Sequence, residues 1–451
     1  YDTIIRKYER EGHWFEKILL IFFTIMLIVS CIPNQQKVWA NSTDNLDIQA
    51  SAAILIDAST GKILYEKNAE VSLPIASMTK IMTEYLVMEA IETEKITWDQ
   101  EVQVSDYAYQ VSQNTSLSNV PLENGGKYTV RELYEAMAIY SANGATIALS
   151  ELIAGSETNF IQMMSEKAEQ LGLQNYKFVN STGLNNSDLY GKHPKGTNAD
   201  DENTMSAKDT ALLAYTMLKK YPEVLEISSI EKKVFQEGKE YPVNMENWNW
   251  MLPGLVYGYE GVDGLKTGTT DAAGACFTGT ATRNGKRVIS VIMNAKTYKA
   301  RFDETRKLFD FGLNQFATQE IVAAGAEIEA QKSLGISKGK EDQVSLETKE
   351  ALSTVVQTGQ TVEFDQEVKL DQALLTEEGK LLAPIKKGQV VGTVTFIPKD
   401  EADYGYIDGK ILTVDLITTN AVEKAGWFSL TMQAIGSFFG NLWDKIMGLF
   451  S

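Results

Sequence analysis

The residues best suited to covalent chemistry in this sequence are Ser77 and Lys80, which lie three positions apart. An apolar run from Ile81 to Ile91 follows them and predicts a helix that lies inside a domain. Residues three apart share one helix face, so the hydroxyl and the amine are expected side by side at the helix N-terminus. A partly desolvated lysine loses preference for its charged form and can accept a proton from a neighbouring hydroxyl. The pair therefore predicts a serine nucleophile with a lysine general base.

The Ser-x-x-Lys pattern has little specificity by itself, because it recurs at Ser229–Lys232 and at Ser337–Lys340. Neither of these copies begins a long apolar helix. A helix cap followed by a solvated lysine explains such copies without any chemistry. The copy at Ser77 differs from them in its buried context and in the polar motifs that follow it.

Two further polar motifs follow Ser77 in order, on different predicted elements. Ser141–Asn143 forms a short loop between a helix that opens at the capping box Thr129–Glu132 and a second helix from Ala145 to Ile153. Lys266–Gly268 lies in a predicted strand and is the only Lys-Thr-Gly in the chain, whereas Ser-x-Asn recurs at Ser112–Asn114. The three motifs, in this order and on these element types, give a combined signal that none gives alone.

Composition bounds the possible functions. A chain of 451 residues predicts two or three domains, and its 60 acidic against 42 basic residues give a net charge of −18 that disfavours nucleic-acid binding. Only two cysteines and two histidines are present, far apart in sequence. We therefore expect catalysis without histidine, metal or other cofactor. His193, in a stretch that contains Gly, Pro and Asn, is interpreted as a loop residue.

The first forty residues predict export from the cytoplasm. Basic residues precede an apolar run from Ile18 to Val29, which is short for a membrane-spanning helix, and the small-residue ending Val38–Ala40 follows. This layout predicts a signal peptide over residues 1–40. The alternative is a lipoprotein cleavage site at Cys31, which would place a lipid on that cysteine.

The next part of the chain predicts strands at both ends with helices between them. The predicted elements are a hairpin at Ala52–Tyr65, helices at Glu157–Leu171 and Ser206–Lys219, a strand at Trp248–Leu252, a hairpin at Ala275–Met293 with a tight Asn-Gly turn, and a helix at Ala300–Phe316. This order predicts an α/β (α+β) fold, in which an antiparallel sheet is sandwiched between helices and carries a helical lobe.

Two segments remain at the C-terminal end. Residues 319–418 alternate between apolar and polar types with glycine turns, which predicts a small all-β domain that acts as a spacer. Residues 421–451 place large apolar side chains such as Phe438, Phe439 and Trp443 on one helical face. Such an amphipathic helix is typical of a membrane-interface anchor. The alternative is a helix that packs on the protein's own core or on a partner.

Ser-x-x-Lys, Ser-x-Asn and Lys-Thr-Gly together occur in β-lactamases and penicillin-binding proteins. The chain closely resembles the serine-type D-Ala-D-Ala carboxypeptidases, which are the low-molecular-mass penicillin-binding proteins of bacterial cell-wall metabolism. The resemblance implies a β-lactamase/transpeptidase-like penicillin-binding serine peptidase domain over residues 41–318, followed by the β-domain and the anchor. It also implies peptidoglycan stem peptides as substrates, β-lactam antibiotics as covalent inhibitors, and a place on the outer face of the bacterial cytoplasmic membrane.

The resemblance also implies catalytic roles for four residues. Ser77 would be the acylated nucleophile, and Lys80 its general base. Ser141 would pass a proton to the leaving D-alanine. Asn143 would hydrogen-bond the substrate amide and help to position Lys80. Removal of the last D-alanine would leave an acyl-enzyme, which water then hydrolyses.

Substrate binding would fall to the strand motif. Lys266, with the hydroxyls of Thr267 and Thr269, would bind the terminal carboxylate of the substrate. Gly268 would leave room for the substrate to lie against the strand. The backbone N–H groups of Ser77 and Thr269 would form the oxyanion hole.

Three other functions remain open on the residues alone. A β-lactamase needs an efficient deacylating base such as a loop glutamate, but no Glu-x-x-Leu-Asn follows Asn143 and the polar loop Asn180–Asn185 has no acid. A transpeptidase differs only in the acceptor of the acyl group. A catalytically inert, membrane-held penicillin-binding or scaffold protein is the third, and the intact motif residues argue against it.

Overall fold

The computed structural model describes residues 46–399, 403–427 and 431. Of the two compact units of the chain, Tyr1–Asp47 and Ile48–Ser451, the second contains nearly all of these residues. The predicted signal peptide, Cys31 and most of the predicted anchor segment lie outside the described residues. Within the part that is described, no helix combines the length and the hydrophobicity needed to cross a membrane.

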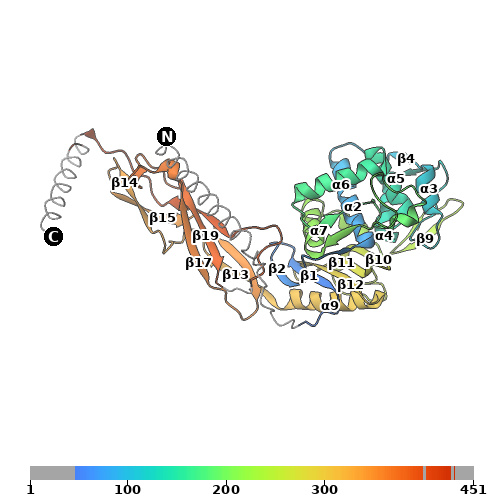
Figure 1. The fold of residues 1–451 in the computed structure, drawn as a ribbon. Helices are drawn as coiled ribbons and strands as arrows, with labels where there is room; N and C mark the ends of the chain where they lie inside the picture. Colours follow the sequence, from blue (N-terminus) through green and yellow to red (C-terminus); the bar gives the residue numbers. More distant parts are fainter. Residues whose placement is uncertain (1–45, 400–402, 428–430, 432–451) are drawn as a thin grey trace, which may run out of the picture. The chain divides into compact units, whose positions relative to one another are not determined.

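A five-stranded antiparallel sheet forms the centre of the first domain, with strand order β10-β11-β12-β1-β2 (Figure 1). Its strands are β1 (Ala52–Asp57), β2 (Ile63–Lys67), β10 (Val262–Thr270), β11 (Gly274–Arg283) and β12 (Lys286–Ala295). Strand β1 pairs with β12, so that Ala52 lies opposite Met293. The sheet therefore joins segments from both ends of the domain, which confirms the predicted arrangement of strands around inserted helices.

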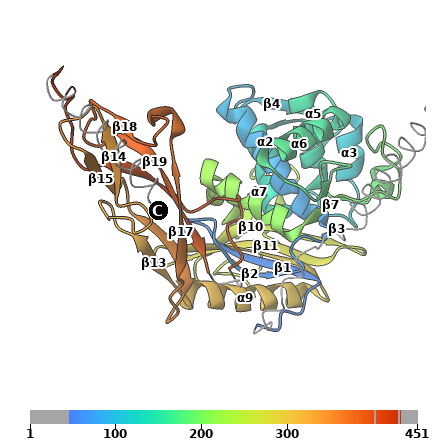
Figure 2. The same cartoon turned by 60° about the vertical axis from the view of Figure 1, so that its left-hand side comes forward.

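Helices cover both faces of this sheet (Figure 2). Helix α9 (Tyr298–Asn314) packs on one face, where it contacts β1, β11 and β12, and α7 (Ala207–Lys220) packs on the other. Every residue of β1 is buried, which explains why its sequence is a continuous apolar run and does not alternate with polar residues. This strand is therefore enclosed on both faces of the sheet.

A buried helix organises the helical lobe. Helix α2 (Lys80–Glu92) contacts α4 (Val130–Tyr140), α5 (Asn143–Ala154), α6 (Glu157–Leu171), α7 and β10. Most of its residues are buried, as the apolar run predicts. A 3₁₀ turn, η1 (Ala76–Thr79), precedes it, so Ser77 lies in a tighter turn than the α-helical one that was expected.

Side-chain caps set the helix boundaries of the lobe. Thr129 and Glu132 form the predicted capping box at the start of α4, with both reciprocal hydrogen bonds present. Ser206 caps α7 by accepting a hydrogen bond from the backbone N–H of Asp209. Gly172 ends α6 in the left-handed conformation, as the sequence predicts. The hairpin turn between β11 and β12 likewise has positive φ at Asn284 and Gly285.

The predicted strand at Trp248–Leu252 is wrong, because the segment is a series of turns. The Asn247 side chain accepts a hydrogen bond from the backbone N–H of Asn249 at 2.8 Å, and the Asn249 side chain accepts one from Met251 at 3.2 Å. Asparagine side chains that bond their own backbone in this way compete with strand pairing. The strand lies just before, at β9 (Val243–Glu246).

The first domain contains several shorter elements. They are β3 (Ser72–Pro74), β4 (Glu101–Gln103), α3 (Asp106–Ser112), β5 (Lys127–Thr129), β6 (Tyr176–Lys177), η2 (Asn186–Leu189), β7 (Thr204–Ser206), α8 (Val224–Ser228) and β8 (Lys232–Phe235). Strand β9 pairs with β8, and β3 pairs with β7. These short pairings hold the loops that run between the lobe and the sheet.

The C-terminal part is rich in β-strands and has its own hydrophobic core, which includes Val394, Phe396 and Leu416. Its elements are β13 (Phe316–Val322), β14 (Ser333–Ser337), β15 (Gln343–Thr348), β16 (Leu352–Gln357), β17 (Phe364–Leu370), η3 (Gln372–Leu374), β18 (Leu381–Leu382), β19 (Val390–Pro398) and β20 (Thr413–Thr418). The chain stays attached to this domain beyond β20, because Val422 is buried and bridges to Ile385.

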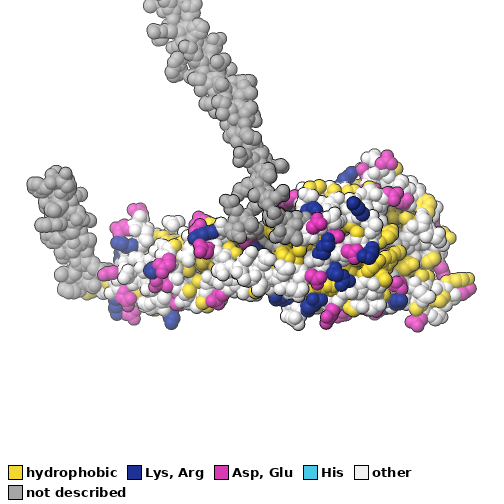
Figure 3. All heavy atoms as spheres, turned by 90° about the horizontal axis from the view of Figure 1, so that it is seen from below, with side chains coloured by type: hydrophobic (Ala, Val, Ile, Leu, Met, Phe, Trp, Pro, Cys, Tyr) yellow, Lys and Arg dark blue, Asp and Glu magenta, His cyan; other side chains and the backbone are white. Residues whose placement is uncertain are grey.

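Charged side chains of both signs are interspersed on the face drawn in Figure 3. Exposed ion pairs occur among the described residues, such as Lys127 with Glu101 at 2.9 Å and Lys349 with Asp415 at 2.9 Å. Exposed pairs of this kind contribute little to stability, on the order of 0–1 kcal/mol each. Burial of the two cores therefore supplies most of the stabilisation.

Replacing Thr129 by alanine is expected to lower the free energy of unfolding of the first domain by about 1 kcal/mol, because the cap of α4 is lost. Urea unfolding followed by circular dichroism measures the change. Thr216→Ala is the matched control, since Thr216 lies inside α7 and alanine is the better helix former there. Equal destabilisation by both substitutions would contradict the capping role.

Candidate active site

The three sequence motifs lie around one cavity of about 560 Å³. Its lining includes Ser77 of η1, Ser141 and Asn143 from the junction of α4 and α5, and Thr267–Thr269 of β10. Lys80 and Lys266 lie beneath this lining, with only 0% and 2% of their surface exposed. Segments that are far apart in sequence thus surround a single hydroxyl, that of Ser77.

The Lys80 amine has three close partners. Its Nζ lies 3.0 Å from Ser77 Oγ, 2.8 Å from Asn143 Oδ1 and 2.7 Å from the carbonyl oxygen of Thr182. The Asn143 amide is itself oriented, because its Nδ2 donates to the carbonyl oxygen of Ser118 at 2.9 Å. The amine is therefore held in one place by groups from three different segments.

These partners suit a neutral amine. Two of them, the Thr182 carbonyl and Asn143 Oδ1, can only accept hydrogen bonds, and a neutral amine has two N–H groups to donate. In that form the lone pair of the amine is left for the Ser77 hydroxyl, whereas an ammonium would donate to Ser77 Oγ as well. Burial lowers the pKa of Lys80 well below its ordinary value and the nearby charge of Lys266 lowers it further, while Glu84 opposes the shift. Lys80 can therefore accept the proton of Ser77 near neutral pH.

The carbonyl of Thr182 belongs to a loop that Asn180 shapes through its side-chain hydrogen bonds. Asn180 Oδ1 accepts hydrogen bonds from the backbone N–H groups of Thr182 at 3.1 Å and Gly183 at 2.7 Å. Gly183 has φ of +81°, and a Cβ there would lie 1.9 Å from the carbonyl oxygen of Ala76. Only glycine lets this loop approach the backbone next to Ser77 so closely.

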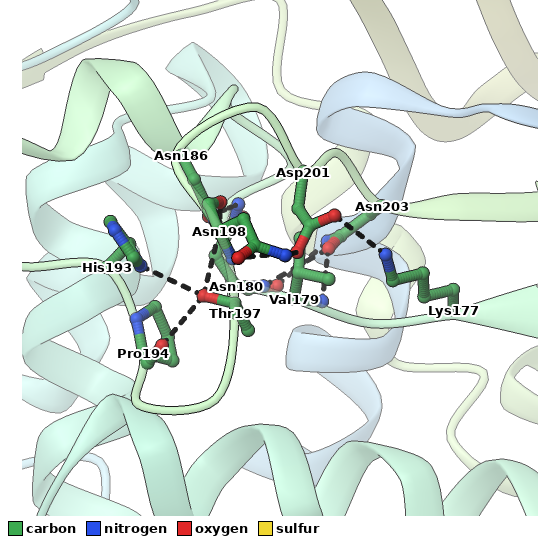
Figure 4. Close-up of polar contacts among 10 residues, drawn as sticks. All are labelled: Lys177, Val179, Asn180, Asn186, His193, Pro194, Thr197, Asn198, Asp201 and Asn203. Atoms are coloured by element: carbon green, nitrogen blue, oxygen red, sulfur yellow. Dashed lines mark hydrogen bonds and ion pairs between the residues drawn. The ribbon is translucent and has the colours of Figure 1, made fainter.

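Asn203 joins the same loop to the Ser77 turn. Its Oδ1 accepts from the backbone N–H groups of Val179 at 2.6 Å and Asn180 at 3.1 Å (Figure 4). Its Nδ2 donates to Thr79 Oγ1 at 2.9 Å. The side chain is 1% exposed, and its Nδ2 also reaches the carbonyl oxygen of Asn180 at 2.8 Å. Asn203 therefore fixes the position of the loop that holds Lys80.

The network continues outward from Asn180 to the surface (Figure 4). Asn180 Nδ2 donates to Asn186 Oδ1 at 3.0 Å, and Asn186 Nδ2 donates to Thr197 Oγ1 at 2.9 Å. His193 Nδ1 lies 3.0 Å from Thr197 Oγ1. His193 therefore belongs to the surface loop, as predicted, and stands apart from the Ser77–Lys80 pair.

Ser141 is held in an unusual backbone conformation at the cavity wall. It is the C-cap of α4 with φ of 60°, which few non-glycine residues adopt. The second Ser-x-Asn copy lines the same cavity through Ser112 and Asn114, a position that no sequence signal predicted. Ser112 Oγ donates to the carbonyl of Tyr109 and accepts from the backbone N–H of Leu122, so its role is structural.

Strand β10 presents the Lys-Thr-Gly motif along the cavity. Lys266 Nζ lies 3.2 Å from the carbonyl oxygen of Thr267, and burial lowers the pKa of this lysine to about 8 against the opposing effect of Glu84. A Cβ at Gly268 would lie 2.5 Å from the carbonyl oxygen of Ile75. The glycine is thus required first by the protein's own backbone, and room for a substrate is an additional reason.

Arg301 of α9 is the cavity residue that sequence reasoning missed. It is 1% exposed, and its Nη1 donates to Thr269 Oγ1 at 3.0 Å and to the carbonyl of Cys276 at 3.4 Å. The available signal was its position, because Arg301 shares a helix face with the buried residues Thr305 and Leu308. An arginine on the apolar face of an amphipathic helix needs a polar partner, and here that partner is the strand motif.

The loop around Thr182 has no acid of its own, but Glu157 reaches it from α6. Its Oε1 accepts hydrogen bonds from Ser181 N at 2.8 Å and Ser181 Oγ at 2.6 Å, and its Oε2 accepts one from Tyr107 at 2.7 Å. The carboxylate is therefore fully engaged in holding the loop. Among the residues that the structure describes, no group of three His, Cys, Asp or Glu side chains could hold a metal ion.

Comparison with known families identifies the chain. A family model described as D-alanyl-D-alanine carboxypeptidase matches residues 38–297, and a model of the penicillin-binding protein 5 C-terminal domain matches residues 316–424. The chain belongs to the D-alanyl-D-alanine carboxypeptidase family. It is a serine-type carboxypeptidase with a mixed α/β transpeptidase-like domain and a C-terminal β-rich domain.

Three individual relatives cover from 60% to 92% of the chain. The D-alanyl-D-alanine carboxypeptidase DacF of Bacillus subtilis is 31% identical over 92% of this chain and 96% of its own length. The solved structure of a peptidoglycan synthesis regulatory factor (PBP3) from Streptococcus pneumoniae is 39% identical, with a TM-score of 0.68 over 83% of this chain and all of its own. Penicillin-binding protein D2 from Listeria monocytogenes, solved in the ampicillin-bound form, is 33% identical with a TM-score of 0.50 over 60% of this chain and 99% of its own.

Replacing Asn203 by alanine is expected to lower the free energy of unfolding by about 2 kcal/mol, because two buried backbone N–H groups lose their acceptor. Because the loop that carries Thr182 loosens, acylation by a penicillin should also slow. Asn198→Ala is the matched control, since Asn198 is exposed and that change should stay within about 0.5 kcal/mol. Denaturant unfolding and penicillin labelling measure the two effects, and equal behaviour of the variants would contradict them.

Proposed function

We propose that this protein removes the terminal D-alanine from peptidoglycan stem pentapeptides through an acyl-enzyme on Ser77. The observation that carries the proposal is the buried amine of Lys80, whose Nζ lies 3.0 Å from Ser77 Oγ and within 2.8 Å of two pure acceptors, Asn143 Oδ1 and the Thr182 carbonyl. A buried neutral amine beside a hydroxyl is the arrangement that activates a serine without histidine.

Acylation begins when Lys80 takes the proton of Ser77 and the freed oxygen attacks the carbonyl between the two D-alanines. The backbone N–H groups of Ser77 and Thr269 stabilise the oxyanion, and such donors each lower the barrier by roughly 3–4 kcal/mol. Ser141, on the cavity wall, returns a proton to the leaving amine. Asn143 orients the substrate amide while it holds Lys80.

The terminal carboxylate of the substrate binds at the strand motif. Lys266 supplies positive charge from beneath β10, and the hydroxyls of Thr267 and Thr269 supply hydrogen bonds. Arg301 adds a second positive charge, because its guanidinium contacts Thr269 Oγ1 and lines the cavity. Two buried cations at one end of the cavity favour a ligand that ends in a carboxylate.

The fate of the acyl-enzyme distinguishes a peptide substrate from a β-lactam inhibitor. Water hydrolyses the ester of the peptide and frees the enzyme. A β-lactam carries a similar amide and a carboxylate, so it acylates Ser77 too, but its leaving group stays tethered after ring opening. The ampicillin-bound form of the Listeria relative supports this expectation.

The alternatives have less support. A β-lactamase would need a free carboxylate for deacylation, and Glu157, which reaches the Thr182 loop, is occupied by Ser181 and Tyr107. An inert scaffold would not need Lys80 buried against Ser77 in a form ready to accept a proton. A transpeptidase would use the same acyl-enzyme with another acceptor, so the products of the reaction separate these two activities.

The purified protein is expected to release free D-alanine from a synthetic pentapeptide and to form a covalent adduct with fluorescent penicillin. Ser77→Ala should abolish both activities, since the nucleophile is lost, and Lys80→Ala should lower acylation by a factor of about 100 or more, because the base is lost. Circular dichroism should show that both variants fold. Peptide release or labelling by Ser77→Ala would contradict the mechanism.

The domain plan that we propose around this site is a signal peptide at residues 1–40, the serine peptidase at 41–318, the β-domain at 319–418 and an amphipathic anchor helix at 421–451. The anchor would hold the exported enzyme at the outer face of the cytoplasmic membrane, near its substrate. Support comes from the sequence, where residues such as Phe438, Phe439 and Trp443 recur at helical spacing.

Ending the chain at Gly426 is expected to release the protein from membranes, because the apolar face of the tail is lost while the Val422 bridge to the β-domain remains. Flotation with lipid vesicles measures binding. Phe438→Asp should weaken binding in the full chain, whereas Ser437→Asp, outside the apolar set, should weaken it less. Membrane binding that persists in the shortened chain would contradict the anchor.

A further inference from the structure

A carboxyl group, Glu84, lies buried beside the two lysines of the active site. Glu84 follows Lys80 by one turn of α2, so the two side chains share one face of that helix. It is 3% exposed, because α2 is enclosed by α4, α5, α6, α7 and β10 (Figure 1). The mechanism above gives this carboxyl no role.

The groups around Glu84 come from several elements. Lys80 of α2 and Lys266 of β10 act on the Glu84 carboxyl through their charges. Arg301 of α9 acts on Lys266. Glu84 itself, with Glu223 ahead of α8, acts on Tyr134 of α4. Tyr134 has a buried hydroxyl without a hydrogen-bond partner. Glu84 is thus a carboxyl buried in the same interior as both active-site lysines, one turn from Lys80 on α2 and on a helix that packs against β10, the strand of Lys266.

The interaction of Glu84 with its surroundings is electrostatic. Within the residues that the structure describes, only burial and the charges of Lys266 and Lys80 act on this carboxyl, and no hydrogen bond contributes. Glu157 is different, because three hydrogen bonds tie it to Ser181 and Tyr107. A buried carboxyl that holds no loop or helix end in place acts mainly through its charge.

The two lysines need different charge states. Lys80 must be neutral to act as a base, and its acceptor partners suit the neutral amine. Lys266 must be charged to bind a carboxylate, yet it is 2% exposed and its hydrogen bond to the Thr267 carbonyl is 3.2 Å long. A buried ammonium with so little compensation needs a counter-charge. Glu84 can supply that counter-charge.

The pKa shifts of Glu84 and Lys266 are consistent with a charged Lys266 that is balanced by the Glu84 carboxylate. Burial raises the pKa of Glu84 to about 7, while both lysines oppose the rise. Burial lowers the pKa of Lys266 to about 8, while the Glu84 carboxylate opposes that fall. The two groups therefore titrate as a coupled pair close to neutral pH.

We propose that Glu84 is a positioning residue that acts through the two lysines: its carboxylate keeps a proton on Lys266 for substrate binding, while Lys80 remains the neutral base beside Ser77. The proposal rests on the roles of Ser77, Lys80 and Lys266 in the proposed function. Glu84 itself touches neither substrate nor reacting atoms.

Glu84→Gln tests the proposal, because it keeps the shape of the side chain and removes the charge. The rate constant for acylation by a penicillin, which also carries a carboxylate, is measured across acid and alkaline pH. Its acid limb reports the deprotonation of Lys80 and its alkaline limb the deprotonation of Lys266. Removing an anion lowers the pKa of Lys266, so the alkaline limb should move to lower pH by about one unit. The acid limb should move less, because burial raises the pKa of Glu84 to about 7 and the wild-type carboxyl is largely protonated there. On the alkaline limb, acylation should be about tenfold slower than in the wild type.

Glu89→Gln is the matched control on the same helix. Glu89 forms an ion pair with Lys167 at 2.7 Å, away from the buried cluster, so its loss should leave the pH profile unchanged. A uniformly slower rate in Glu84→Gln with both limbs in place would show a structural role only and would overturn the proposal.

Lys266→Arg supplies a second test that does not depend on the folding of Glu84→Gln. An arginine stays charged over the whole range, so the alkaline limb should disappear. An alkaline limb that stays at the wild-type pH would mean that the Lys266 proton does not set it, and would overturn the proposal. Failure of the wild type to label at all would instead contradict the proposed function, so the two failures are distinguishable.

Discussion

The chemistry that we propose depends on one amine that is buried where its charged form is disfavoured. Lys80 has no exposed surface, and three oxygen atoms from Ser77, Asn143 and Thr182 surround its Nζ. Burial alone would make a lysine costly, but two pure acceptors satisfy the N–H groups of the neutral form. The same environment disfavours the ammonium, so burial lowers the pKa of Lys80 well below its ordinary value, as the proposed base role requires.

Much of the surrounding structure serves to keep those acceptors in place. Asn180 shapes the loop that carries the Thr182 carbonyl, and Asn203 ties that loop to the Ser77 turn. Gly183 and Gly268 allow two other segments to approach the backbone of that turn more closely than any side chain would permit. Fixed amides and close backbone contacts provide preorganisation, so little rearrangement is needed when the proton moves.

The charge distribution follows from the ligand. The chain has a net charge of −18, yet Lys266 and Arg301 bring positive charge to the strand side of the cavity, where a substrate carboxylate would bind. Buried cations are costly and must be balanced. Thr269 and the carbonyl of Cys276 partly satisfy Arg301, and the charge of Glu84 on α2 acts on Lys266. Ligand binding and proton transfer are therefore coupled through one small set of buried charges.

The sequence determined by itself the elements whose signals are local. The buried helix after Ser77, the capping box at Thr129 and the Asn284-Gly285 hairpin turn were all predicted, because each depends on residues a few positions apart. The three motifs were also recognised in order, and with them the enzyme family. The false strand at Trp248–Leu252 shows the limit of such signals, since asparagine side chains there satisfy the backbone as turns.

Only the tertiary structure determines which groups surround the proton between Ser77 and Lys80. Thr182 contributes a backbone carbonyl, which no sequence pattern reveals, and it lies 102 positions from Lys80 in the chain. From the sequence, Arg301 is one residue of an amphipathic helix, and only the tertiary structure shows its contact with Thr269 of β10. Glu84 is likewise one polar residue in an apolar run, and only the tertiary structure shows that the charges of two lysines act on it. Periodicity fixes which face of an element is buried, but the pKa of a buried group depends on which distant charges and dipoles share its interior, and the packing of the whole domain sets those.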